Sequence, residues 1–166
     1  MYLLKLYDQI GDDYSIHQKV RSLVPSTYKV LFQTKGGCVT IATCLNIEGS
    51  KEIKLDAQEG SQYLFDIRVN PARRDRKTGK VTSLHETNHV AWFKKKAEEN
   101  GFEIIAIKTE DEGSRSSQKG QSTITIRSLF IIGMLIVKDK EKFNRALQHG
   151  IGRGKGLGFG LLNIFN

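Results

Sequence analysis

Three residues near the start of the chain have the types and spacing needed for acid–base chemistry on a phosphodiester. Tyr14 and His17 lie three residues apart in a segment with apolar residues at helical spacing, so they share one helix face, and Arg21 follows one turn later. Histidine, with an unperturbed pKa of about 6.5, can accept or donate a proton near neutral pH, and a cation can stabilise phosphate charge. Such a set could cut RNA without a metal, by moving a 2′-hydroxyl proton to a base and a second proton to the leaving 5′-oxygen. The same stripe also fits a solvated helix face, so other features must decide.

Glycine occupies every second position from Gly150 to Gly160, in the sequence GIGRGKGLGFG. The segment follows an expected helix and leads into an expected strand, the reverse of a GxGxxG dinucleotide loop, and Lys155 is followed by glycine where a Walker A loop needs Ser or Thr. These mismatches argue against nucleotide binding. Bare backbone can instead lie flush against another surface with its N–H groups toward phosphates, although simple packing on a helix is the alternative. The six glycines are Gly150, Gly152, Gly154, Gly156, Gly158 and Gly160, and the cations between them are Arg153 and Lys155.

A basic segment runs from Arg68 to Lys80, where six cations stand against the single acid Asp75. The chain as a whole carries a net charge of +8. Such an excess favours a polyanion, and contacts to phosphates would position a nucleic acid without reading its sequence. The cations of the segment are Arg68, Arg73, Arg74, Arg76, Lys77 and Lys80.

The motif His85-Glu86-x-x-His89 matches the HExxH pattern, in which two histidines one helical turn apart bind zinc and the glutamate acts as base. A catalytic zinc needs a third protein ligand, and the residues that would continue the metzincin pattern are absent. Ser83 and Glu86 also fit a helix capping box, which would explain the glutamate without a metal. A zinc hydrolase is therefore kept only as a less favoured alternative.

The pattern of apolar residues predicts an α+β fold of two tandem ferredoxin-like domains, the first of them truncated. We place the first domain at residues 1–60 and the second, with the basic and glycine-rich segments, at residues 61–166. The first half is expected to contain a strand at Tyr2–Tyr7, a helix capped by Asp12 or Asp13 and stopped by Pro25, a hairpin around 35–37, and a short strand at 53–55. The second half is expected to contain strands at 63–69, 102–108, 123–137 and 161–165, helices at 83–100 and 139–148, and a mobile polar linker at 110–121.

Four segments together resemble one family. The ending GIGRGKGLGFGLLNI, the block NPARRDRKTGK followed by HVAWFKKK, the N-terminal MYLLKL and the helix IHQKVRSLVP are similar to those of CRISPR-associated repeat-RNA endoribonucleases of the CasE type, in the RAMP superfamily. The match spans both ends and the middle of the chain in the family's order. One departure is that few residues are available between the first hairpin and Gly60 to complete the first domain.

The resemblance implies that the protein binds the stem-loop of the CRISPR repeat and cleaves precursor crRNA at the 3′ base of the stem. It implies a reaction without metal or cofactor that leaves a 2′,3′-cyclic phosphate and a 5′-hydroxyl, with His17 catalytic and Tyr14 assisting. Arg21, from its place on the same helix face, is a weaker candidate for charge stabilisation. It also implies that Arg153, Lys155 and the cations at 68–80 face RNA. We expect a cytoplasmic protein that stays on its product and joins a Cascade-like complex, with no membrane partner. The main alternative is a guide-RNA-binding subunit that does not cut.

Overall fold

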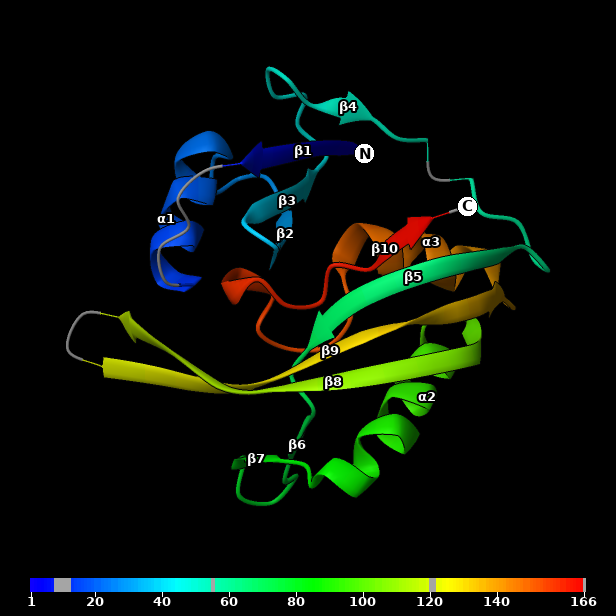
Figure 1. Cartoon of the computed structure of the whole chain (residues 1–166). Coiled ribbons are helices and arrows are strands. Elements are labelled where there is room, and N and C mark those ends of the chain that lie inside the picture. The colour runs from blue at the N-terminus through cyan, green and yellow to red at the C-terminus, as the bar shows by residue number, and fades with distance from the viewer. Residues whose placement is uncertain (8–12, 55, 120–121, 166) are drawn as a thin grey trace.

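The first half of the chain forms a four-stranded antiparallel sheet with one helix on one face (Figure 1). The computed structural model describes residues 1–7, 13–54, 56–119 and 122–165. The sheet order β2-β3-β1-β4 is that of a ferredoxin-like unit, but residues 44–50 connect β3 to β4 without a second helix, so this domain is truncated as predicted. The elements are β1 (Tyr2–Tyr7), α1 (Asp13–Leu23), β2 (Val30–Lys35), β3 (Cys38–Thr43) and β4 (Lys51–Glu52).

Helix α1 is held on this sheet by its apolar side. Ile16, Val20 and Val24 are buried against Leu4 of β1 and Phe32 of β2. The helix starts at Asp13, and the other expected cap, Asp12, lies outside the described residues. The short strand predicted at residues 53–55 lies earlier, at Lys51–Glu52, and residue 55 is also outside the described part.

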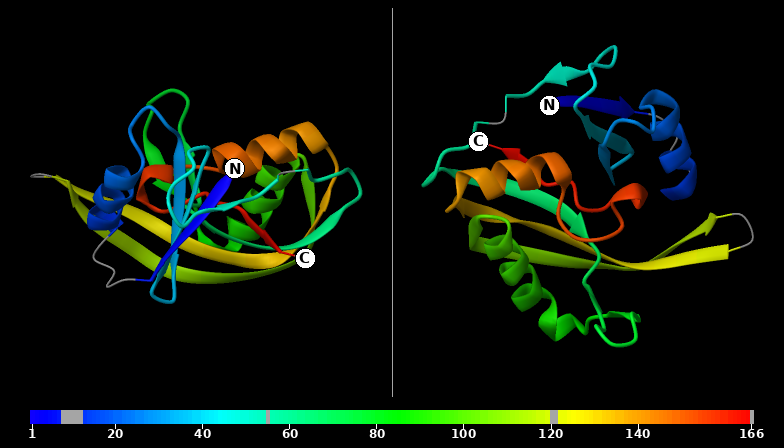
Figure 2. Two further views of the ribbon diagram at one scale, coloured as in Figure 1. Left: turned by 90° about the horizontal axis from the view of Figure 1, so that it is seen from above. Right: turned by 180° about the vertical axis from the view of Figure 1, so that it is seen from behind.

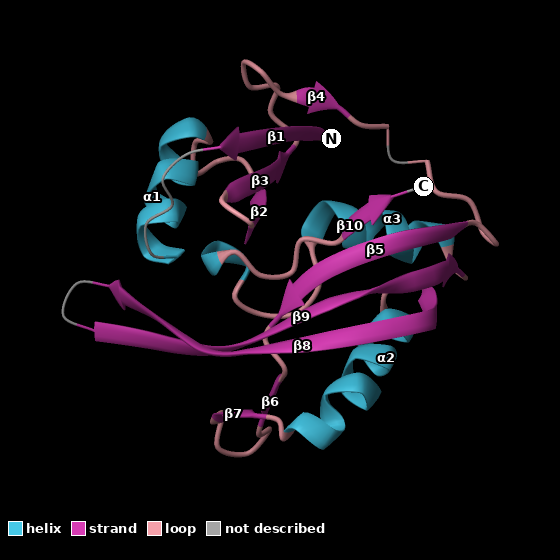
Figure 3. Cartoon of the chain, in the orientation of Figure 1, coloured by secondary structure: helices cyan, strands magenta, loops and turns pink. Residues whose placement is uncertain are grey.

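The second half forms a complete ferredoxin-like unit with the strand order β10-β5-β9-β8 (Figure 3). Helices α2 and α3 cover one face of this sheet, as Figure 2 shows from behind. In the core, Phe143 of α3 packs edge to face on Phe102 of the sheet, with ring centroids 5.5 Å apart. The elements are β5 (Gln62–Val69), β6 (Ala72–Arg74), β7 (Val81–Ser83), η1 (Glu86–Asn88), α2 (His89–Glu99), β8 (Phe102–Lys119), β9 (Ser122–Val137), α3 (Lys140–His149), η2 (Lys155–Leu157) and β10 (Asn163–Phe165).

The prediction of a mobile linker at residues 110–121 is wrong for the residues that the structure describes there. These polar residues continue strands β8 and β9 into a long antiparallel hairpin (Figure 1). Ser116 pairs with Thr125 across the two strands, and their hydroxyls lie 3.0 Å apart. We call the part that projects beyond the sheet, residues 113–119 and 122–127, the arm. The register shifts between Asp111 and Gly113, at the base of the arm.

The predicted capping box at the start of α2 is also wrong. Ser83 is the last residue of strand β7 and pairs with Ala72. The turn η1 comes first, capped by the His85 side chain, and α2 begins only at His89. The Glu86 carboxylate instead accepts a hydrogen bond of 2.8 Å from Arg127 in β9.

The two sheets are joined by a small apolar cluster and by one glutamine. Leu31 and Ala42 of the first sheet pack on Leu161, which precedes β10. The Gln33 side chain accepts a hydrogen bond of 3.0 Å from the Arg68 backbone N–H and donates one of 2.9 Å to Asp66, so it continues the hydrogen bonding of β5. None of the helices in the described part of the chain is long and apolar enough to cross a membrane.

Candidate active site

His17 lies half-buried on α1 between two aromatic rings. Its ring centroid is 6.3 Å from that of Tyr14, with the planes nearly parallel at 28°, and 6.4 Å from that of Phe32. The Nδ1 atom of His17 is buried. Proton exchange with a bound substrate would therefore use Nε2, and the Tyr14 and Phe32 rings fix the direction in which the imidazole presents it.

The glycine-rich segment folds back onto this helix, and the turn η2 contacts both α1 and β2. A Cβ atom on Gly156 would lie 3.7 Å from Cε1 of His17, so the loop backbone passes directly beside the imidazole. Lys155, the residue before, is half-buried. Burial lowers the pKa of its ammonium group, and the nearby positive charge of Lys29 lowers it further. The loop thus brings a partly desolvated cation to the helix that carries His17 and Tyr14.

The glycines allow this loop to be pinned at both ends. The Ile151 N–H donates to the Gly160 carbonyl over 2.9 Å, and the Gly160 N–H donates to the Arg68 carbonyl over 2.7 Å. A Cβ atom on Gly160, where φ is +83°, would lie 2.5 Å from the Ile151 oxygen, so a side chain cannot be accommodated there. Gly158 packs close to the Phe32 ring, which also supports His17. The same strand, β2, therefore positions both the loop and the histidine.

Arg21 lies one turn beyond His17 but is engaged with the backbone. Its Nη1 donates a hydrogen bond of 3.1 Å to the Tyr28 carbonyl, which ties the end of α1 to the segment leading into β2. This contact limits how far the guanidinium can move toward a phosphate. Lys155, predicted from the sequence to bind RNA, belongs to the turn η2, which contacts α1 directly.

The arm lies along the same side of the molecule as α1, and β8 contacts α1 (Figure 1). Its described side chains are mostly hydroxyl-bearing and cationic, with Ser114, Arg115, Ser116 and Thr125 among them. From Gly113 to Ser128 the sequence contains no acidic residue. A surface of hydroxyls and cations is suited to the phosphates and sugars of a nucleic acid.

Arg68, predicted to bind RNA, is buried and occupied. Its exposed fraction is 5%, and Nε and Nη2 each donate a hydrogen bond of 2.6 Å to the Glu112 carboxylate at the base of the arm. Nη1 donates to the Thr34 carbonyl in β2. Because the guanidinium nitrogens already donate hydrogen bonds to Glu112 and Thr34, Arg68 is no longer expected to bind RNA. It links β2, β5 and the arm instead.

The Arg68–Glu112 pair makes stability depend on pH. Burial works to raise the pKa of Glu112, but hydrogen bonds from Arg68 and Ser128 outweigh it and hold the pKa below its usual value. A depressed folded pKa contributes stability above the ordinary glutamate pKa of about 4.3, and that stability is lost as the pH falls through the folded pKa. We expect Glu112→Gln to lower the free energy of unfolding by about 2 kcal/mol at pH 7, since it leaves a buried guanidinium without its anion.

Urea unfolding of the wild type and Glu112→Gln at several pH values tests this expectation. The difference between the two proteins should be largest at pH 7 and shrink as the pH falls below the ordinary glutamate pKa. Glu110→Gln, at an exposed position nearby in β8, is the matched control. A difference that stays constant down to strongly acidic pH would contradict the ion pair.

The other cations of the predicted basic segment are exposed on the β6–β7 hairpin. The Asp75 carboxylate accepts hydrogen bonds from the N–H groups of Thr78 and Lys77, and these bonds build the turn of this hairpin. Together with a bond from the Thr78 hydroxyl, they lower the pKa of Asp75. The hairpin lies on the side of the β8–β9 ribbon away from α1 (Figures 1 and 2). The structure therefore does not bring these cations together with His17. They are Arg73, Arg74, Arg76, Lys77 and Lys80.

The residues of the HExxH motif are not arranged as a zinc site. His85 is exposed before η1, whereas His89 is buried at the start of α2 with its Nε2 3.1 Å from the Leu84 carbonyl. The two imidazoles are therefore not ligands one turn apart on a single helix, and Glu86 is paired with Arg127. Within the described residues no group of three or more His, Cys, Asp or Glu side chains could hold a metal ion.

A sequence profile of the family described as CRISPR associated protein matches residues 20–165, which include the arm, the glycine-rich loop and the last residues of α1 but begin after Tyr14 and His17. The chain belongs to the CRISPR associated protein family. The match extends over both sheets and confirms the resemblance seen in the sequence.

Individual proteins are similar to the chain over different shares of their length. The CRISPR-associated endoribonuclease Cse3 of Thermus thermophilus is 29% identical over 118 residues, which cover 63% of this chain and 56% of that protein. The chain thus aligns with just over half the length of this curated relative. The solved structure of Cse3 bound to a 19-nt RNA superposes with a TM-score of 0.89 at 22% identity and covers 100% of both chains. A chain of a CRISPR RNA-guided surveillance complex superposes with a TM-score of 0.75 at 18% identity, covering 99% of this chain and 98% of that one.

Proposed function

We propose that this protein is a metal-independent endoribonuclease that binds the stem-loop of a CRISPR repeat and cleaves precursor crRNA at the 3′ base of the stem. The observation that carries the proposal is the contact of the glycine-rich loop with α1, which places Lys155 at the helix that bears His17 and Tyr14. Family membership and the similarity to Cse3, named an endoribonuclease, support the substrate and the reaction class. The fold shared with the structure of Cse3 bound to a 19-nt RNA supports binding of an RNA of similar length.

In the proposed reaction the 2′-oxygen of the nucleotide before the cut attacks the adjacent phosphorus while the bond from phosphorus to the 5′-oxygen breaks. The 2′-hydroxyl proton passes to a base and a proton passes to the leaving 5′-oxygen, so the products are a 2′,3′-cyclic phosphate and a 5′-hydroxyl. His17 performs one of these two proton transfers through Nε2. Tyr14 orients the phosphate or the imidazole, and Lys155 stabilises the charge that develops on the phosphoryl oxygens.

The RNA stem is proposed to lie against the arm and the glycine-rich loop, where Arg153 is exposed. The cations of the β6–β7 hairpin would contact a stem that extends past the arm, which makes them secondary contacts that raise affinity. Several such contacts would keep the product bound after cleavage. The fold shared with a chain of a surveillance complex supports a further role as one subunit of a Cascade-like assembly.

Cleavage of a synthetic CRISPR-repeat hairpin in the presence of EDTA tests the proposal. We expect the hairpin to be cut at the 3′ base of its stem at an unchanged rate, because the proposed chemistry uses only side chains. Mass spectrometry of the 5′ fragment should show a 2′,3′-cyclic phosphate, and a hairpin with a 2′-deoxy nucleotide before the cut should bind but remain intact.

Two other outcomes would contradict the proposal. Tight binding without cutting of the all-ribose hairpin would assign the protein to the guide-RNA-binding subunits that do not cleave. Loss of cleavage in EDTA, with recovery on addition of a divalent metal, would show a metal-dependent reaction instead.

A further inference from the structure

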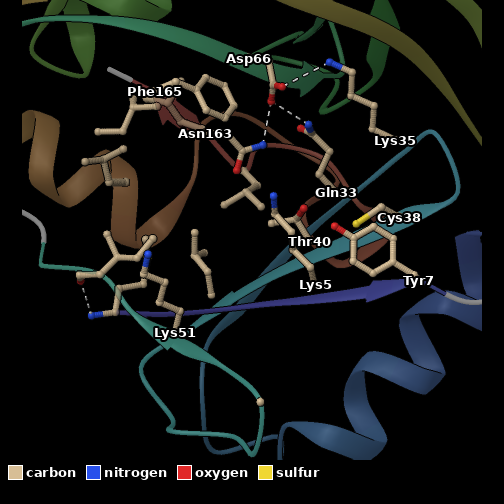
Figure 4. A pocket seen from close by; sticks show the side chains of 18 residues that line it. Lys5, Tyr7, Gln33, Lys35, Cys38, Thr40, Lys51, Asp66, Asn163 and Phe165 are labelled. Carbon is tan, nitrogen blue, oxygen red and sulfur yellow. Dashed lines mark hydrogen bonds and ion pairs between the residues drawn. The ribbon is translucent and has the colours of Figure 1, made fainter.

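A second concave site lies between the two sheets, away from the candidate active site (Figure 4). Its volume is about 690 Å³, within the range of about 300–1,000 Å³ that ligand sites usually have. Alternate residues of β1 point to opposite faces of the first sheet, so Leu4 packs under α1 while Leu3, Lys5 and Tyr7 line the cavity. A molecule bound here would not occupy the surface that carries His17.

The opposite wall of the cavity is built from the edge of a strand. Five consecutive residues, Leu161 to Phe165, line it. The last three of them, Asn163 to Phe165, form β10, and successive side chains of a strand point to opposite faces, so their shared contact with the cavity indicates that β10 presents its edge to it. β10 is the terminal strand of the second sheet and pairs only with β5 among the described strands. An extended segment placed beside it could continue the sheet by backbone hydrogen bonds.

The side chains around the cavity combine an apolar base with a cationic rim. Leu3, Leu161 and Phe165 supply apolar surface, and the Phe165 side chain remains 48% exposed at the end of β10. Three lysines, all exposed, come from three strands of the first sheet: Lys5, Lys35 and Lys51. Exposed apolar surface bordered by one sign of charge is typical of a site for a partner of opposite charge.

The free strand edge, more than the charge at this wall, distinguishes a peptide from a nucleic acid as the occupant. Asp66 is 6% exposed and accepts hydrogen bonds from Asn163 at 2.7 Å and Gln33 at 2.9 Å, with the Lys35 ammonium 3.5 Å away (Figure 4). These contacts hold the Asp66 carboxylate in the wall beside the Lys35 ammonium, so its charge does not by itself select between a carboxylate and a phosphate ligand. The free strand edge offers backbone donors and acceptors that match another strand and have no counterpart in RNA.

We propose that this cavity is a docking groove for an extended, acidic and apolar segment of a partner protein, which adds a strand to the free edge of β10. Alternate apolar side chains of that segment would pack on Leu3 and Phe165, and its carboxylates would meet Lys5, Lys35 and Lys51. The inference does not depend on the proposed RNA cleavage. A variant that cannot cut RNA would still bind such a segment.

Binding of a labelled octapeptide of alternating valine and glutamate tests the proposal. We expect saturable binding by fluorescence anisotropy, with amide shifts in ¹⁵N-labelled protein confined to β10 and β1. An N-methylated version, whose methyl groups block the N–H groups facing β10, should lose binding. The same peptide with lysine in place of glutamate should not bind.

The variants Lys5→Glu and Lys94→Glu distinguish binding in the groove from general attraction to a positively charged protein. Both change the net charge equally, but Lys5 lines the cavity and Lys94 lies exposed on α2. We expect Lys5→Glu to weaken the acidic peptide at least about tenfold, and Lys94→Glu to match the wild type within about twofold. Both positions are exposed, so both variants should retain the wild-type melting temperature.

Three results would overturn the proposal. The first is no saturable binding, and the second is equal binding of the N-methylated peptide. The third is a shift of the same β10 amide signals on addition of an eight-nucleotide oligouridylate, which would assign the cavity to RNA.

Discussion

Replacement of His17 by alanine is expected to slow single-turnover cleavage of a repeat hairpin by about 10²–10⁴-fold, the usual contribution of one positioned acid or base. The affinity for the hairpin should change little, because the imidazole is half-buried between Tyr14 and Phe32 and forms only a small part of the RNA surface. Rapid-quench measurement with enzyme in excess gives the rate, and a filter-binding titration with a 2′-deoxy hairpin gives the affinity.

A histidine outside the site provides the control for this experiment. His85→Ala removes an exposed imidazole at the start of η1 and should leave the cleavage rate unchanged. Tyr14→Phe should keep the ring packed beside His17 and reduce the rate less than His17→Ala, because only the hydroxyl is lost. A His17→Ala protein that cleaves within about tenfold of the wild-type rate would show that proton transfer does not pass through this residue.

Replacement of Lys155 by alanine should be the second large effect, a loss of about 10²–10³-fold in the cleavage rate, comparable to removal of one charge-stabilising donor from a transition state. The reason is its place on η2, against α1 and partly removed from water. Lys155→Arg keeps the charge and should restore part of the rate. The measurement is the same single-turnover assay, with hairpin affinity determined in parallel.

The pH dependence of these proteins distinguishes a charge-stabilising role from simple RNA binding. A lysine is charged below its pKa, and burial together with Lys29 lowers the pKa of Lys155, so its charge is lost at a lower pH than that of an ordinary lysine. The wild-type rate should therefore decline on the alkaline side earlier than the rate of Lys155→Arg, whose guanidinium stays charged.

Arg153→Ala is the matched control for the loop, since Arg153 is exposed two residues away. It should reduce hairpin affinity and the steepness of its salt dependence, with little change in the rate at saturating enzyme. If Lys155→Ala behaves in the same way, the loop only holds RNA. If both variants retain full affinity, salt dependence and rate, the alternating glycines serve packing alone.

Much of the fold could be predicted because its signals are local. Apolar residues recur at helical spacing in α1, Asp139 caps α3, and the two glycines at 36–37 mark the first hairpin turn. The arm was missed because none of its side chains that the structure describes is buried in a core, and its sequence lacks the apolar alternation that identifies a strand. Its pairing is shown only by cross-strand partners such as Ser116 and Thr125.

The candidate site was predicted in part for a similar reason. Tyr14 and His17 are neighbours along one helix, and their spacing is visible in the sequence. The place of Lys155 beside them and the burial of Arg68 by Glu112 depend on contacts between residues far apart in the chain. The sequence shows that the segment at 68–80 is basic. It does not show that one of its cations, Arg68, is paired with the Glu112 carboxylate at the base of the arm.

The contact between η2 and α1 also determines when activity can arise during synthesis. α1 is made before the loop that carries Lys155, and strands β5, β8 and β9 of the second sheet lie between them in the sequence. A nascent chain arrested before Gly150 contains His17 but lacks both the lysine and the backbone that passes beside the imidazole. For the proposed nuclease we therefore expect ribosome-bound chains that end before Gly150 to be inert toward repeat transcripts.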